Sequence, residues 1–226
     1  MPAARDAPHR GRGTRAGLDR ARIVEAARGL DPNALTMQAV ADRLGVDRKA
    51  LNYHVTDRES LLELTAIDAF IEQSSRTRIP PDADWREACR LFAVGTRDSI
   101  IATGVLVTHM RMTTQRDLGA AGPADAVLAK LQEAGFDEET AARGLHLLAS
   151  ICVGFARDVV MARREGSHPQ LAELRRALAE TPGGFESLRH LFSAGIDTYD
   201  DAQFEFSLAA FFHAMEALPR SGAENR

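Results

Sequence analysis

The stretch that most constrains this chain runs from Leu35 to Val55 and reads LTMQAVADRLGVDRKALNYHV. Two short helical patterns meet here at Gly45, where the chain must turn sharply and a positive φ is expected. Thr36 can cap the first helix and Asp47 the second. The side chains that point inward are Val40, Ala41, Leu44, Leu51 and Val55. The stretch therefore predicts a helix-turn-helix whose small core needs a third helix to complete it.

The flanking segments supply that third helix and a longer one. Apolar residues recur at every third position: Leu18, Ala21, Val24, Ala27 and Leu30. This spacing predicts a helix that ends before Pro32, because proline excludes α geometry from the residue before it. After the motif, Thr56 as N-cap and Glu59 form a capping box that opens a helix to about Ser75. Residues 1–17 mix Pro, Gly and Arg with almost nothing to bury, so they predict a disordered basic arm.

The outward side of the second helix carries side chains that donate and accept hydrogen bonds. A helix of about two turns fits the major groove of B-DNA, where such side chains read base edges or hold phosphates. Arg48 and Lys49 suit guanine or phosphate. Asn52 can pair with adenine, while Tyr53 and His54 suit phosphate or sugar.

Three residues outside this helix join the predicted DNA interface. Gln38 and Thr36, at the start of the preceding helix, can reach a base edge and a phosphate respectively. Arg58 lies in the first turn of the following helix, where its charge and the free amides can hold a backbone phosphate together.

The distribution of charge agrees with a polyanion at one end of the chain. The formal net charge is −4, but residues 1–58 hold 11 Lys+Arg against 7 Asp+Glu, about +4, and the remainder holds 17 against 25, about −8. A basic first quarter on an acidic body indicates that only the N-terminal part meets nucleic acid.

The segment LTMQAVADRLGVDRKALNYHVTDRESLLE resembles the DNA-binding region of the tetracycline-repressor (TetR) family. The matching residues are Leu35, Thr36, Val40, Ala41, Leu44, Gly45, Val46, Ala50, Leu51, His54, Val55, Asp57, Arg58 and Leu61 or Leu62. Asp47 stands where the family usually has Ser or Thr. Asn52 stands where the family has a phosphate-binding tyrosine, and Tyr53 occupies the next position. Either Tyr53 takes over that contact or Asn52 reads a base. The resemblance implies an all-helical second domain that dimerises and binds a small molecule.

Residues 79–84, IPPDAD, interrupt the helical pattern because they contain two prolines. After them the rest of the chain again has helical patterns, and the period-two alternation of a sheet is absent. The predicted helices cover 85–103, 105–114, 124–134, 138–164, 170–180, 185–193 and 201–218. We therefore expect an all-α protein with a basic arm at 1–17, a helix-turn-helix domain at 18–62 and a helical effector-binding and dimerisation domain at 63–226.

The predicted helices at 138–164 and 201–218 each carry two apolar stripes. A helix that is apolar most of the way round must be covered on two sides. One side can face the interior and the other a symmetry mate in a four-helix interface, or both can be buried within one chain. The resemblance favours a homodimer on a near-palindromic operator. The predicted interface residues are Leu145, Leu148, Cys152, Val159, Leu208, Phe211 and Met215. The second stripes are Leu147, Ile151, Gly154 and Met161, then Ala209, Phe212 and Ala217.

A small-molecule effector site is expected where polar groups interrupt apolar helical faces. The candidates are Thr96, Thr103, His109, Met112, Gln115, His146, Ser150 and Asp158, with Phe92, Met110 and Phe155 as apolar walls. His109 or His146 could serve a metal, yet no HxxxH spacing or carboxylate cluster supports one, so we predict no metal and no cofactor.

Other classes of function have less support. The sequence has no GxSxG, phosphate loop, HExxH or nucleophile with an evident base, which disfavours an enzyme. A protein-interaction module that docks through the helix-turn-helix is the main alternative. No apolar run approaches the roughly 20 residues of a membrane span, and the N-terminus lacks the apolar region of a signal peptide. We therefore expect a cytoplasmic, ligand-responsive DNA-binding regulator, most simply a repressor, with no membrane partner.

Overall fold

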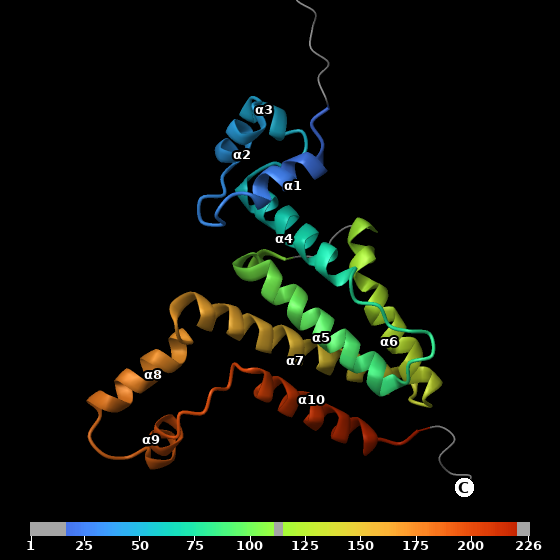
Figure 1. The fold of residues 1–226 in the computed structure, drawn as a ribbon, viewed down its shortest axis with the longest axis vertical. Coiled ribbons are helices and arrows are strands. Elements are labelled where there is room, and N and C mark those ends of the chain that lie inside the picture. Colours follow the sequence, from blue (N-terminus) through green and yellow to red (C-terminus); the bar gives the residue numbers. More distant parts are fainter. Residues whose placement is uncertain (1–16, 111–114, 221–226) are drawn as a thin grey trace, which may run out of the picture. The chain divides into compact units, whose positions relative to one another are not determined.

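The computed structural model describes residues 17–110 and 115–220, and every regular element in these two ranges is a helix (Figure 1). The elements are α1 (Arg20–Arg28), α2 (Met37–Leu44), α3 (Arg48–Leu51), α4 (Arg58–Ser74), α5 (Trp85–Thr103), the 3₁₀ helices η1 (Gly104–His109) and η2 (Gln115–Ala121), α6 (Gly122–Glu133), α7 (Glu138–Glu165), α8 (Pro169–Glu180), α9 (Glu186–Ser193) and α10 (Asp201–Glu216). The all-α prediction is confirmed. The chain divides into two compact units, Met1–Leu61 and Leu62–Arg226.

The first unit contains α1 to α3 and the start of α4. Helix α1 begins later than its periodicity predicts, at Arg20, behind Asp19, whose side chain accepts a hydrogen bond from the Arg22 amide at 2.8 Å. Its buried residues are Ile23, Val24, Ala26 and Ala27. Of the residues predicted at every third position, only Val24 and Ala27 belong to this buried set. An α-helix turns once in 3.6 residues, so positions spaced strictly by three move gradually away from one side of the helix.

The helix-turn-helix forms as its capping residues predict. The Thr36 hydroxyl accepts a hydrogen bond from the Ala39 amide at 3.1 Å, and Asp47 accepts one from the Lys49 amide at 2.7 Å. Gly45 ends α2 in the left-handed conformation, with φ 65°. Leu35, Val40, Ala41, Leu51 and Val55 are buried, while Leu44 is half-buried. The predicted small core is therefore present.

The start of α4 differs from the predicted capping box. Helix α4 begins at Arg58, and the carboxylate that accepts from a free amide is that of Asp57, which bonds the Ser60 amide at 2.8 Å. Thr56 instead shares a hydroxyl hydrogen bond of 3.0 Å with Ser60. Hydrogen bonds from the Ser60 amide and hydroxyl lower the pKa of Asp57, so the cap stays ionised. The capping function is thus present one residue later than predicted.

The second unit is built around α5 and α7, which pack against each other and against α6, while α10 packs along α7 (Figure 1). Aromatic side chains fill the core at one end, where the Trp85 ring meets Phe136 at 5.3 Å and Phe212 at 5.9 Å, both edge to face. A second cluster joins Ile67 and Phe70 of α4 to Ile100, Val107 and Ala156. Helix α9 buries no residue, and α8 buries only Leu178 among its own.

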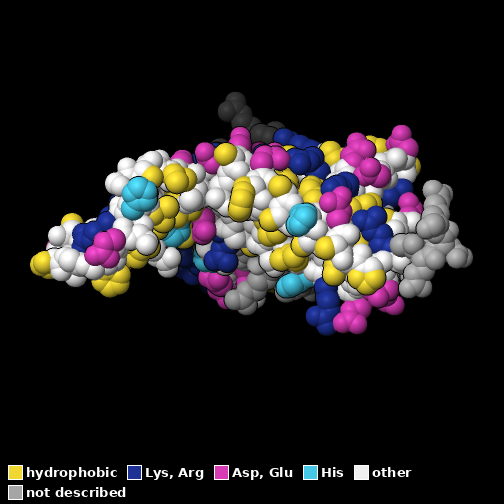
Figure 2. Space-filling view, turned by 90° about the horizontal axis from the view of Figure 1, so that it is seen from below, with side chains coloured by type: hydrophobic (Ala, Val, Ile, Leu, Met, Phe, Trp, Pro, Cys, Tyr) yellow, Lys and Arg dark blue, Asp and Glu magenta, His cyan; other side chains and the backbone are white. Residues whose placement is uncertain are grey.

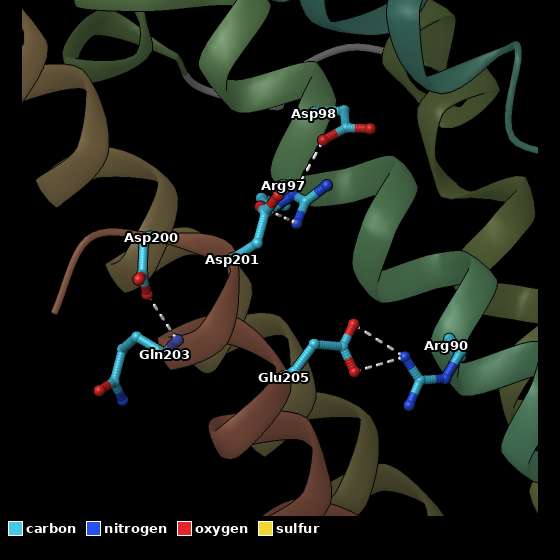
Figure 3. Close-up of polar contacts among 7 residues, drawn as sticks. All are labelled: Arg90, Arg97, Asp98, Asp200, Asp201, Gln203 and Glu205. Carbon is cyan, nitrogen blue, oxygen red and sulfur yellow. Dashed lines mark hydrogen bonds and ion pairs between the residues drawn. The ribbon is translucent and has the colours of Figure 1, made fainter. Parts of the chain in front are cut away.

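Ion pairs fix the position of α10 along α5 (Figure 3). Arg90 Nη1 lies 2.9 and 2.7 Å from the two carboxylate oxygens of Glu205. Arg97 bonds Asp98 at 2.9 Å and Asp201 at 3.1 Å, and its guanidinium lies 4.6 Å from the centre of the Phe204 ring. These contacts lock the first turns of α10 in one register against the core.

This packing corrects the prediction for the dimer interface. Leu148, Cys152, Val159, Leu208, Phe211 and Met215 are buried inside the chain, and Leu145 is half-buried against the same core. Their side chains have almost no surface to offer to a second copy. On the second stripes, Leu147, Gly154, Met161, Ala209 and Ala217 are exposed, whereas Ile151 is half-buried and Phe212 is buried. The apolar stripes predicted from the sequence to form the dimer interface are thus the ones that pack inside the chain.

Two helical stretches, 85–109 and 138–165, are long and apolar enough to match a membrane span by length and composition, contrary to the expectation from the sequence. The core helices of a globular unit pass the same test. Here both stretches are central helices that pack on each other through buried residues such as Phe92 and Leu148. Their apolar character is accounted for by this core.

Candidate functional site

Helix α3 and the turn that follows it present the predicted DNA-reading side chains. The regular helix is a single turn, Arg48–Leu51, shorter than the two turns expected, and hydrogen bonds from the His54 and Val55 amides to Leu51 O continue the coil. Leu51 and Val55 fix this segment to the core of the first unit. The side chains between them are thereby held on its outer surface.

Four of those outer side chains are exposed and unengaged. Arg48, Lys49, Asn52 and Tyr53 are all exposed, and the Tyr53 side chain reaches 91 %. Neither Arg48 nor Lys49 has an ion pair among the described residues. An exposed tyrosine next to two cations without ion pairs contributes little to folding, because it buries little surface and has no hydrogen bond among the described residues. Such a surface is suited to contact with an anionic partner.

The remaining predicted contacts already have partners within the first unit. Thr36 uses its hydroxyl as the α2 cap, and Gln38 Nε2 donates to Asp42 Oδ1 at 2.7 Å. His54 is half-buried. Arg58 Nε donates to Leu35 O at 2.8 Å, and its Nη2 lies 3.5 Å from Pro32 O. Arg58 therefore holds the loop that leads into α2, whatever it also contacts outside the chain.

A second such clamp was missed in the sequence. Arg43 Nη1 donates to Gly29 O at 3.0 Å, and so joins α2 to the end of α1. A Cβ on Gly29 would lie 2.2 Å from the same guanidinium, so the arginine uses the space that the glycine leaves open. The sequence shows a basic residue in the last turn of α2 and a glycine at the end of α1, but it does not show that the fold brings the two into contact.

The eleven predicted effector-site residues do not share one environment. Phe92 belongs to the buried core, and the Thr103 hydroxyl donates to Ser99 O at 2.8 Å. His146 and Ser150 are exposed on α7, and Thr96 is half-buried on α5. His109 and Met110 lie at the end of η1, where Met110 packs on the cluster around Ile100. Met112 lies outside the described residues, and Gln115 opens η2.

Phe155 lines a cavity, and Asp158 lies beside a residue that lines another. Phe155 lines a cavity of about 370 Å³ between α5, α7 and the start of α10, and its ring lies 5.0 Å from that of Phe204. Asp158 Oδ1 lies 3.6 Å from Nε2 of His168, a residue that the sequence did not single out. In the described part of the chain, no three His, Cys, Asp or Glu side chains gather as a set of metal ligands.

Comparison with known proteins places this geometry in context. No protein-family model matches the chain. The chain is 29 % identical to the tetracycline repressor protein class A from transposon 1721 of Escherichia coli, over 78 % of its own length and 79 % of that protein. A possible TetR-family transcriptional regulator from Streptomyces coelicolor A3(2) superimposes with a TM-score of 0.72 at 26 % identity, over 89 % of this chain and all of the other. In sequence and in fold, the chain is similar to TetR-family transcriptional regulators.

A further solved TetR-family structure extends the likeness in fold. The Streptomyces coelicolor protein ActR, in complex with actinorhodin, superimposes with a TM-score of 0.67 at 23 % identity, over 89 % of this chain and 98 % of ActR. Each of these matches covers far more of the chain than the helix-turn-helix alone. The likeness in fold therefore covers the helical unit as well as the predicted DNA-reading head.

Proposed function

We propose that this protein is a TetR-family repressor. A homodimer would hold a near-palindromic operator through α2 and α3 of each copy, and a small-molecule effector bound in the helical unit would release it. The main support for the proposal is the outer surface of α3 and the turn after it, where the side chains of Arg48, Lys49, Asn52 and Tyr53 are exposed and have no hydrogen bond or ion pair with any other described residue. The proposal assigns no chemical reaction to the helical unit.

Each exposed side chain has a role that its chemistry supports. Arg48 and Lys49 supply cations for guanine or phosphate. The Asn52 carboxamide can make a paired contact with adenine, and the hydroxyl of the exposed Tyr53 can reach a phosphate beside it. Of the alternatives that the sequence leaves open, we propose the one with Tyr53 as the phosphate contact and Asn52 as the base contact; the exposure of both residues is compatible with it.

We infer that the dimer forms through the exposed sides of α7 and α10. Leu147, Gly154 and Met161 recur at a spacing of seven on α7, so they share one side of that helix. On α10, Phe206 is 71 % exposed, and Ala209, Ala210 and the C-cap residue Ala217 are exposed with it. Figure 2 looks onto the second unit from below, and apolar side chains recur along it between charged ones. Two helices from each copy would form a four-helix interface.

Effector control follows from a shift between two states of the dimer. An effector can change operator affinity only as far as it binds the two states differently. Helix α4 links the two units covalently and contributes Ile67 and Phe70 to the core of the second. Movement of these two side chains is the route by which a change in that core would reach the DNA-reading head, in the cytoplasm where the operator lies.

The decisive experiment measures binding of the full chain to an operator duplex selected from random sequence, by fluorescence anisotropy at several salt concentrations. The substitutions R48A, K49A and Y53A combined should weaken binding by at least about a hundredfold, since each lost contact costs on the order of 1–3 kcal/mol. A matched double variant, R76A with R176A, removes the same charge from exposed positions of the helical unit and should bind as the parent does.

Salt dependence provides an independent criterion. Loss of two phosphate contacts per copy should lower the slope of log affinity against log salt by about 0.9 for each contact. Undiminished duplex affinity in the triple variant, or a flat salt dependence in the parent, would contradict the proposal. Loss of a protein partner by that variant would instead support the interaction-module alternative.

A further inference from the structure

A second cavity in the helical unit is larger than the one beside Phe155 and is formed by residues that the proposed function does not use. Its volume is about 620 Å³, within the range of small-molecule sites. The end of α7, the first turns of α8 and the segment that leads into α10 form its walls. Val159, Arg163 and Tyr199 line this cavity and the smaller one as well, so the two cavities adjoin.

Two rings form a flat platform on the wall of the cavity. The imidazole of His168 and the phenol of Tyr199 stack with centroids 5.3 Å apart and planes 13° from parallel. A short turn holds the tyrosine, since the Tyr199 amide donates to Asp197 Oδ1 at 2.8 Å. Val159, Leu171 and Ile196 supply apolar surface around the platform. A planar aromatic ring can therefore stack here and bury its edge against aliphatic groups.

The charges at the cavity favour an anion. Two guanidinium groups line it, those of Arg163 and Arg175, against one carboxylate, that of Asp197. Arg163 has no ion pair among the described residues, and Arg175 lies 5.1 Å from the centre of the Phe192 ring rather than beside a carboxylate. The nearby Asp158 faces His168 Nε2 at 3.6 Å. An excess of cations stands out in a unit whose overall charge is acidic.

His168 shows that the polar contacts of the cavity are incomplete. It is only 5 % exposed, yet its Nδ1 has no hydrogen-bond partner among the described residues. Buried polar nitrogens are nearly always paired, and each exception needs an explanation. Partial burial and the neighbouring Asp158 raise the pKa of Tyr199, so its hydroxyl keeps its proton and remains a donor.

We propose that this cavity binds a planar aromatic carboxylate, whose ring extends the His168–Tyr199 stack and whose carboxylate lies between Arg163 and Arg175. The inference goes beyond the proposed function, because it requires neither DNA nor a change in operator affinity.

The test is calorimetric titration of the full-length protein, without DNA, with naphthoate and with the neutral amide of the same ring, naphthamide. Naphthoate should bind once per chain and at least about tenfold more tightly than naphthamide, because only the anion gains the guanidinium contacts. Substitution R163Q or R175Q should each weaken naphthoate by about tenfold while naphthamide changes less than about twofold. Substitution Y199A should weaken both probes, since both use the ring platform.

Arg176 supplies the matched control, because it is the next residue of α8, equally charged and exposed, but paired with Glu173 outside the cavity. R176Q should bind naphthoate as the parent does. In proton NMR of the parent, naphthoate should shift the imidazole signals of His168, which are assigned by their loss in H168Q. This measurement locates the probe even if a variant at an arginine fails to fold.

Three outcomes would each overturn the inference: naphthamide bound as tightly as naphthoate, R176Q as harmful as R175Q, or no binding of either probe up to about 1 mM. Operator binding is measured in a separate experiment. A protein that binds its operator but not naphthoate would refute this inference and leave the repressor proposal intact.

Discussion

Arg58 has one role expected from the sequence, a contact to phosphate, and another seen in the structure, a contact to the loop before α2. From the sequence it is expected to hold a phosphate, but the structure shows its guanidinium bonded to Leu35 O and Pro32 O. A positioning role predicts that R58K and R58Q both lower the free energy of unfolding, by about 1–2 kcal/mol, because a charged hydrogen bond to a carbonyl is lost. Urea titration measures this change. If R58Q, but not R58K, also reduces the salt slope of operator binding by about 1, Arg58 contacts phosphate as well.

Gly45 is the residue on which the turn between α2 and α3 depends. Its φ of 65° lies in the left-handed region, and no heavy atom lies within 4 Å of a Cβ built there, so the cost of a side chain is one of backbone strain alone. We expect G45A to lower the free energy of unfolding by about 1–2 kcal/mol and G45N by clearly less, because asparagine adopts this conformation more readily. Equal stability of G45A and the parent in urea would contradict this account.

The two cysteines should behave as buried thiols. Burial raises the pKa of Cys89 and of Cys152 to about 12. Thiolates are the reactive form, so a disulfide reagent should not modify the native protein at about pH 8 and should modify both residues after denaturation. The unfolded thiols ionise near pH 8.5, so the free energy of unfolding should fall as pH rises above this value, by at most about 1.4 kcal/mol per pH unit for each thiol. C89A with C152A should lose this component of the pH dependence.

At the level of elements, two ion pairs join α10 to α5, and their arginines differ in how far they are exposed to solvent (Figure 3). Arg90 and Glu205 are both about half exposed, with side-chain values of 47 % and 52 %, whereas Arg97 is 17 % exposed and also covers the Phe204 ring. We expect R90Q to change the free energy of unfolding by less than about 0.5 kcal/mol, because exposed pairs contribute little. R97Q should cost about 1 kcal/mol through the lost contact with the Phe204 ring, since Asp201 is 91 % exposed and is solvated by water when unpaired. Equal effects in thermal unfolding would contradict the distinction.

The elements also show what could be predicted from the sequence. The helix-turn-helix was predictable because local signals determine it: caps at Thr36 and Asp47 and a left-handed glycine at position 45. The internal stripe of α7 was not, because Leu148 and Leu147 belong to two apolar stripes of similar composition, and only the packing of α5, α6 and α10 against α7 decides which is covered.

The cavities were harder still to foresee. Arg163 and Tyr199 lie far apart in the sequence, and neither interrupts an apolar stripe in a way that marks it as a binding residue. They meet because the chain leaves α7, passes through α8 and α9, and returns at the start of α10. Residues chosen from single helices, such as His146 and Ser150, are exposed instead. A site made by the return of a distant segment has no signature in local spacing.

For the molecule as a whole, the proposed recognition of an operator by half-sites requires two copies to associate as a dimer. The exposed stripes of α7 and α10 predict that L147E combined with F206E places a charge on each helix of the interface and converts the dimer into a monomer. A buried unpaired carboxylate disfavours association strongly, so analytical ultracentrifugation should find the single-chain mass. The monomer should still occupy one half-site and should lose at least about a hundredfold in affinity for the whole operator, because the second half-site no longer binds within the same complex.

L118E supplies the control, since Leu118 is 65 % exposed on η2, away from both stripes, and its variant should remain dimeric. A dimer that survives L147E with F206E would place the interface elsewhere on the helical unit.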